Sequence, residues 1–199
     1  MSNVLLVTTS PRLGESVSTK VATELANKIA AKSGGKVTLR DVGAKPLAHI
    51  DETMVIATRS GKTDLTAHEK AALDRSMDIV KEVKAADIIV IGAAMFNFGP
   101  TTNLKGWVDH LAVPSQTFQY GANGPEGLVK GKKVYVVTAS AGTYGEGSAD
   151  HLKPWILVVL GFLGMTDVEV ITIDKLAYGP EAVAATMDAA NAKIAQIAA

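Results

Sequence analysis

The sequence contains no cysteine in its 199 residues. This absence excludes disulfide bonds, thiolate nucleophiles and metal or iron–sulfur centres held by cysteine. It also fits a reducing compartment. The first residues, MSNVLLVTTSPR, lack the basic segment that precedes the apolar part of a signal peptide. We therefore expect a cytoplasmic protein.

Excess charge of either sign is also absent. The chain has 20 basic and 20 acidic residues, and no run of lysine or arginine. This balance predicts neither a nucleic-acid partner nor an anionic membrane partner. The longest apolar run, residues 154–165, is too short to cross a bilayer. It indicates a buried core helix instead.

Sequence motifs of hydrolytic and metal-dependent catalysis are missing. The four histidines are scattered, without HExxH spacing, and there is no GxSxG nucleophile elbow. We expect no metal site and place His49, His68, His110 and His151 on the surface or in loops. The alternative for His110 and His151 is a position near a ligand.

Glycine-rich phosphate loops are missing too. Residues 7–20, VTTSPRLGESVSTK, follow the first apolar run and contain only Gly14. They match neither the GxxxxGK[ST] loop of nucleoside triphosphatases nor the GxGxxG fingerprint of dinucleotide-binding proteins. The stretch is instead rich in hydroxyl groups.

The sequence does contain a regular alternation of strands and helices. Short apolar runs typical of strands occur at 3–9, 36–42, 87–94, 132–140 and 167–174. Helical patterns occur at 17–32, 101–112 and 149–164. Two more begin at a capping box at Thr66 and at the GPE sequence of residues 179–181, and the second of these continues to the end of the chain. Residues 43–65 show no regular pattern and are expected to be irregular, and residues 113–131 predict a loop or hairpin excursion.

Five such strand–helix units predict an α/β fold. We expect one domain, residues 1–199, with a doubly wound parallel sheet in the flavodoxin-like order 2-1-3-4-5 and helices on both faces. Ligands bind such sheets beyond the carboxyl ends of the strands. Three unusual stretches follow the first, third and fourth strands: 9–18, 94–100 and 138–147.

Each of these stretches has two interpretations. Ser10, Ser16 and Ser18 provide neutral donors for a phosphate at a helix start, or a serine simply caps the helix. Residues 95–98, MFNF, offer a wall for a flat heteroaromatic ring, or the loop tucks its two phenylalanines into the core. Residues 139–142 allow close approach of a ring to the backbone, or form an ordinary turn. Taken together, the three stretches describe a site for flavin mononucleotide (FMN).

The chain resembles the FMN-dependent NADH-azoreductase family, relatives of the flavodoxin-like quinone reductases. The residues that carry the resemblance are SPRLGESVS (10–18), MFNF (95–98), TFQYGANGPEGLVKGKK (117–133), GFLG (161–164) and AYGPE (177–181). Their order and spacing extend over nearly the whole chain.

The resemblance implies an FMN site. The phosphate would be held by Ser10, Ser16, Val17 and Ser18. The ring would be lined by Met95, Phe96, Asn97, Phe98, Ala139, Ser140, Ala141 and Gly142. It also implies a homodimer with active sites at the interface, with Phe118, Tyr120 and Phe162 as candidate walls near the ring. Tyr144 follows the fourth strand, where it lies over the ring or is a plain loop tyrosine.

The resemblance further implies the reaction. NADH, with NADPH as an alternative, passes a hydride to flavin N5 and leaves before a quinone or an azo compound binds, in ping-pong order. No protein side chain is then required as a catalytic residue. Two departures from the family pattern, Phe96 for tyrosine and Ser140 for a cation, leave the nicotinamide preference and the natural acceptor open.

Two other functions suit the same fold. A one-electron carrier of the flavodoxin type would dock through a strongly acidic face, which the balanced charge does not indicate. A non-catalytic binding module on this fold would bind no flavin, and it leaves the three unusual stretches unexplained.

Overall fold

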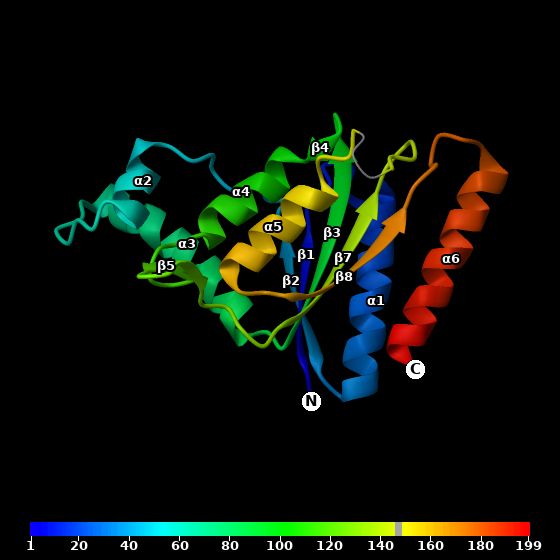
Figure 1. Ribbon diagram of the computed structural model, residues 1–199, viewed down its shortest axis with the longest axis horizontal. Helices are drawn as coiled ribbons and strands as arrows, with labels where there is room; N and C mark the ends of the chain where they lie inside the picture. Colours follow the sequence, from blue (N-terminus) through cyan, green and yellow to red (C-terminus); the bar gives the residue numbers. More distant parts are fainter. Residues whose placement is uncertain (146–148) are drawn as a thin grey trace.

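A five-stranded parallel sheet forms the centre of the molecule (Figure 1). The computed structural model describes residues 1–145 and 149–199. The strands are β1 (Asn3–Thr8), β2 (Lys36–Asp41), β3 (Ile88–Phe96), β7 (Lys133–Ala139) and β8 (Asp167–Ile173). Their order, β2-β1-β3-β7-β8, confirms the predicted flavodoxin-like arrangement.

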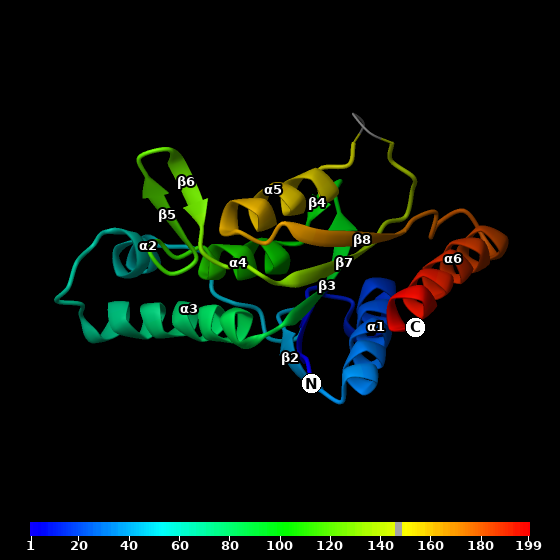
Figure 2. The same cartoon turned by 60° about the horizontal axis from the view of Figure 1, so that its bottom comes forward.

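Helices cover both faces of this sheet, which explains why its inner strands are apolar throughout. One face carries α1 (Val17–Ser33) and α6 (Pro180–Ala198); the other carries α3 (Ala67–Ala85), α4 (Thr102–Leu111) and α5 (Lys153–Leu163) (Figures 1 and 2). Because side chains alternate along a strand, Val4 and Leu6 pack on the α1 side, whereas Leu5 and Val7 pack on the α3 side.

Local sequence signals define the ends of the helices. Ser16 caps α1 by accepting the N–H of Thr19, and Gly34, with φ of 64°, ends that helix in the left-handed region. At α3, Thr66 and Glu69 form the predicted capping box.

The prediction of an irregular segment at 43–65 was wrong in part. This segment contains the helix α2 (Glu52–Arg59), whose first turn is capped by the Asp51 carboxylate at 2.8 Å from the Met54 nitrogen. The helix has eight residues and buries few of them, so its apolar period is too short to stand out in the sequence.

The excursion at 113–131 contains a two-stranded hairpin, β5 (Phe118–Gly121) and β6 (Gly124–Gly127). The hairpin docks against the end of α5. A Cβ added to Gly127 would lie 2.1 Å from the Gly164 nitrogen, so only glycine permits this approach.

Helix α5 differs from its predicted form. It begins at Lys153 rather than near residue 149, because the Asp150 carboxylate accepts the backbone N–H groups of Leu152 and Lys153. The prediction of a buried core helix was also wrong in part. Ile156, Leu160 and Leu163 are buried in a core cluster that they share with residues of the sheet and α4, whereas Val158 on the same helix is 71% exposed.

Over the residues that the structure describes, no helix is both long enough and apolar enough to span a membrane.

Candidate functional site

The three unusual stretches converge on one cavity at the carboxyl edge of the sheet. Its volume is about 290 Å³. The residues that line it are Ser10, Arg12, Ser16, Val17, Ala94, Met95, Phe96, Ala139, Ser140, Ala141, Leu176 and Ala177. Ends of β1, β3 and β7 therefore meet here, at the switch point of the strand order, as the sequence predicts.

One end of the cavity is polar and lies at the start of α1. The Ser16 hydroxyl lines it, and Ser18 lies behind, fully buried, with the two hydroxyl oxygens 3.1 Å apart. The first N–H groups of a helix have no partner within the helix, and the helix dipole favours negative charge there. Ser16 is thus both a cap and a lining residue, so the two interpretations of its hydroxyl are compatible.

The loop before α1 is held by hydrogen bonds rather than by glycines. The Leu13 nitrogen donates to the Ser10 carbonyl and the Ser16 nitrogen to the Leu13 carbonyl, at 3.2 and 3.0 Å. The Arg12 nitrogen donates to the Ser10 hydroxyl at 3.3 Å. Leu13 has a φ of 49°, a costly conformation for a branched residue, and it begins the short 3₁₀ turn Leu13–Glu15.

The second stretch turns outward at the end of β3. Phe96 is 41% exposed and Phe98 is 50% exposed, so the alternative of a loop tucked into the core is wrong. Asn97 and Phe98 have φ of 46° and 68°, and the chain then returns as the two-residue strand β4 (Gly99–Pro100). Strained residues and exposed aromatics at one loop are typical of a ligand site.

The third stretch is locked onto the loop after β8. The Ser140 nitrogen donates to the Ile173 carbonyl at 3.0 Å, and the Ala177 nitrogen donates to the Ala141 carbonyl at 3.0 Å. This pairing brings Leu176 and Ala177 into the lining. Gly142 does not line the cavity; a Cβ on it would lie 3.1 Å from the Tyr144 hydroxyl.

Tyr144 lies at the rim of the site. Its ring meets that of Phe98 edge to face, with centroids 5.7 Å apart. It also lines a small cavity of about 30 Å³ together with Met95, Asp150 and Asp174. Residues 146–147 of the predicted stretch 138–147 lie outside the described residues.

The three aromatic wall candidates lie elsewhere in the chain. Phe118 contacts Tyr120 and Phe162, with centroids 5.8 and 4.6 Å apart. This cluster joins the hairpin to the last turn of α5, and none of its three residues lines the cavity. The structure does not bring these residues to the cavity of their own chain.

One histidine prediction was wrong. His110 is only 1% exposed, with Nδ1 2.9 Å from the Ser76 hydroxyl and Nε2 3.1 Å from the Ala48 carbonyl. It joins α4, α3 and the segment before α2, and burial lowers its pKa. The other three histidines are exposed. Within the described residues, no cluster of three histidine or acidic side chains could hold a metal ion.

Four lining residues were missed in the sequence: Arg12, Ala94, Leu176 and Ala177. Arg12 lies inside the hydroxyl-rich stretch, and its positive charge has the sign that attracts a phosphate. Leu176 and Ala177 follow the fifth strand, whose end also faces this edge of the sheet. Only the pairing with residues 140–141 brings them to the cavity.

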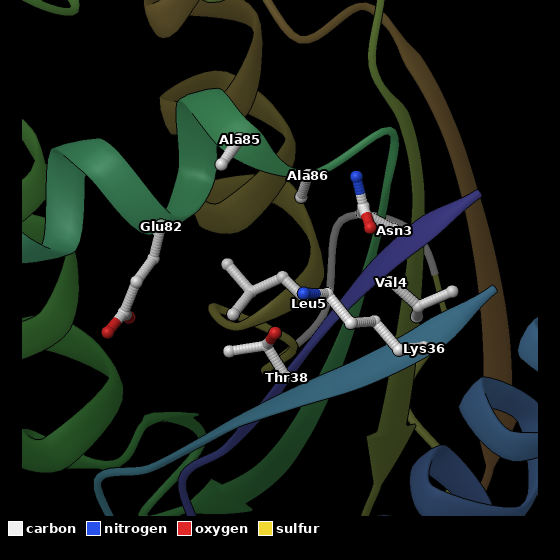
Figure 3. A pocket seen from close by; sticks show the side chains of 8 residues that line it. All are labelled: Asn3, Val4, Leu5, Lys36, Thr38, Glu82, Ala85 and Ala86. Atoms are coloured by element: carbon white, nitrogen blue, oxygen red, sulfur yellow. The ribbon is translucent and has the colours of Figure 1, made fainter. Parts of the chain in front are cut away.

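Two further cavities differ in their relation to the site. One of about 590 Å³ adjoins it and shares Phe96, with Pro11, Pro46 and Asn97 among its walls. The other, of about 210 Å³, lies at the amino ends of β1 and β2 beside the end of α3 (Figure 3). Its Glu82 carboxylate is already paired with Arg40. Only the first is at the edge where such sheets bind ligands.

Comparison with known proteins gives concordant matches along the whole chain. The family model of the flavodoxin-like fold matches residues 2–198. An FMN-dependent NADH:quinone oxidoreductase of Agrobacterium fabrum (strain C58 / ATCC 33970) is 48% identical over 202 residues, covering 100% of this chain and 98% of the relative.

Solved structures give the same result for the fold. The azoreductase from Bacillus anthracis str. Sterne has a TM-score of 0.85 at 25% identity, covering 100% of this chain and 99% of that one. An FMN-dependent NADH-azoreductase from Bacillus anthracis str. Ames Ancestor, in complex with FMN, has a TM-score of 0.86 at 21% identity. The coverage there is 99% of this chain and 100% of that one, and the likeness at this identity concerns the fold alone.

Proposed function

The chain belongs to the flavodoxin-like fold family and, within it, to the FMN-dependent NADH:quinone oxidoreductases, and on this premise we propose that it binds FMN and uses NADH to reduce quinones and aromatic azo compounds. The observation that carries the proposal is the convergence of a hydroxyl-rich helix start, an exposed aromatic turn and a small-residue loop on one cavity. The azo substrates rest on the likeness to the Bacillus anthracis azoreductase.

The lining of the cavity fits FMN at both ends. The helix start, with Ser10, Ser16 and Val17, offers neutral donors for a phosphate. The opposite walls, with Met95, Phe96 and residues 139–141, are mainly apolar and suit an aromatic ring. The N–H of Ala141 makes no hydrogen bond within the described residues, so it can donate to a polar ring edge. Ser18 lies behind Ser16, with its hydroxyl 3.1 Å from that of Ser16.

Bound FMN would supply the two-electron chemistry between nicotinamide and acceptor. The protein's residues then bind, orient and exclude water. Asn97, Phe98 and Tyr144 stand at the exposed rim, where they can position an incoming flat substrate. Because the nicotinamide and the acceptor would each stack on the bound flavin in the same place, we expect the nicotinamide to leave before the acceptor enters, which is a ping-pong order. NADH is the reductant that the relative's name gives, and NADPH remains the alternative.

The same proposal includes a homodimer in the cytoplasm. The 71% exposed Val158 leaves an apolar part of α5 without a partner in one chain. Phe118, Tyr120 and Phe162 do not line the cavity of their own chain. A second copy that covers α5 would account for both features by bringing this aromatic cluster to the neighbouring site as its wall.

The test is a visible absorption spectrum of the purified protein after FMN is added and excess removed, followed by NADH under argon. Flavin bands should stay with the protein and bleach with NADH alone, before any acceptor is present. Bleaching that needs both substrates would contradict the ping-pong order. A protein that keeps no flavin would refute the enzyme, and flavin that NADH cannot reduce would favour the one-electron carrier.

A further inference from the structure

A single charged side chain lines the candidate site. Of the residues around the cavity of about 290 Å³, Arg12 is the one with an ionisable side chain. No carboxylate among the described residues forms an ion pair with it. A guanidinium beside a cavity, without an internal partner, is available for an anionic ligand.

The position of Arg12 is set by the loop and not by its own side chain. Its nitrogen donates to the Ser10 hydroxyl at 3.3 Å, and its carbonyl accepts from the Glu15 nitrogen at 3.0 Å. These bonds fix the backbone of Arg12 between Ser10 and the start of α1. The side chain therefore begins at the polar end of the cavity, next to Ser16.

A phosphate at this end would bring more negative charge than the neutral donors balance. A phosphate monoester carries about −1.5 to −2 charges at pH 7. Ser10, Ser16 and the free N–H groups of α1 offer hydrogen bonds and partial positive charge, but no full charge. Arginine binds phosphate through two parallel N–H donors.

We propose that Arg12 pairs with the phosphate of FMN and makes this site select the phosphorylated flavin over riboflavin. This inference rests on the proposed function, because it assumes that the cavity holds FMN. Arg12 adds no chemistry to the reaction; it sets the affinity for the cofactor and makes that affinity depend on salt.

The test compares the binding of FMN and riboflavin to apoprotein of the wild type, Arg12→Ala and Arg12→Lys, by quenching of flavin fluorescence at low and high salt. Arg12→Ala should bind FMN about tenfold more weakly at low salt, since one charged hydrogen bond to an exposed side chain is lost. Its riboflavin affinity should be unchanged, the FMN loss should shrink at high salt, and Arg12→Lys should recover part of it. Lys20→Ala is the matched control, because it removes an exposed cation of α1 that does not line the cavity.

The outcomes separate this inference from the proposed function. Wild-type protein that binds no FMN would refute both. Wild-type binding with an equal loss of FMN and riboflavin in Arg12→Ala would overturn the inference alone, because it would indicate a disturbed loop. An unchanged FMN affinity with a raised KM for NADH would also overturn it, since Arg12 would then serve the dinucleotide.

Discussion

At the scale of the residue, the hydroxyls at the start of α1 combine support of the helix with the proposed binding of phosphate. Replacing both Ser16 and Ser18 with alanine should weaken FMN binding at least tenfold, because hydrogen bonds to a charged group are lost. Loss of the Ser16 cap should also cost about 1 kcal/mol of stability. FMN titration below the unfolding temperature checks the affinity, and thermal unfolding checks the cost.

Ser33→Ala is the matched control for this variant. It removes a hydroxyl at the other end of α1, where Ser33 donates to the Ala30 carbonyl at 3.3 Å. FMN affinity should be unaffected. Retention of flavin by the double variant, equal to that of the control, would show that the phosphate is held elsewhere.

His110 predicts a pH dependence of folding. Burial lowers its pKa from the ordinary value of 6.5. Just below about pH 6.5, this histidine is therefore protonated in the unfolded chain but still neutral in the folded chain. The stability that the neutral ring contributes is therefore complete above this pH and is lost as pH falls through the lower folded pKa. Denaturant unfolding at pH 7.5 and pH 5 should show a smaller decline for His110→Gln than for the wild type.

The control is His49→Gln, which removes an exposed histidine near the same segment. It should lose stability on acidification as the wild type does. If His110→Gln follows the same curve, the buried ring does not govern the acid sensitivity.

At the scale of the element, α5 carries the proposed interface. Val158→Arg adds charge at a position 71% exposed in one chain, so a monomer should tolerate it. If α5 lies between two copies, the buried charge should dissociate the dimer, because an unpaired charge in an interface costs several kcal/mol. Light scattering should then report a mass near the 20.7 kDa of a single chain.

Leu39→Arg is the counterpart on another surface. Leu39 is 59% exposed on β2, the edge strand of the sheet. Exposed edges pair readily with other chains. A dimer that survives Val158→Arg but not Leu39→Arg would transfer the interface from α5 to this edge.

At the scale of the whole molecule, shared sites predict complementation. One variant loses the polar end of the cavity (Ser16→Ala with Ser18→Ala), and another loses the aromatic wall (Tyr120→Ala with Phe162→Ala). A mixed dimer has one site with both defects and one site with neither. Mixing equal amounts at limiting FMN, with time for exchange, should restore about a quarter of the wild-type activity from two weak variants.

A mixture of the first variant with a chain that carries all four changes provides the control, since it can form no intact site. Activity that stays at the average of the two variants in both mixtures would mean that each chain builds its site alone.

Local patterns in the sequence are sufficient for the fold, because it depends on alternation and capping. Apolar runs mark the buried strands, and Thr66 with Glu69 marks the start of α3. Short elements are less visible: α2 has eight residues and β4 has two, and neither extends over enough periods to be recognised.

The candidate site, like the fold, is predictable from the sequence only in part. Ser10, Ser16, Met95 and residues 139–141 lie at or just after strand ends, so the sequence alone places them at one edge of the sheet. Residues 176–177 join them only through loop hydrogen bonds that no sequence pattern displays, whereas Arg12 lies within the same hydroxyl-rich stretch as Ser10 and Ser16. His110 lies in a helix with a half-apolar pattern, and its burial depends on Ser76 and Ala48, distant in the chain.

The sequence by itself determined the alternation of strands and helices, the edge that holds the site and the absence of cysteine chemistry, because each follows from composition or from periods of two and 3.6 residues. Tertiary structure decided which side chains share the cavity, where the aromatic cluster lies and which side of α5 stays uncovered. These depend on contacts between residues far apart in the chain, which close only when the helices pack on the sheet.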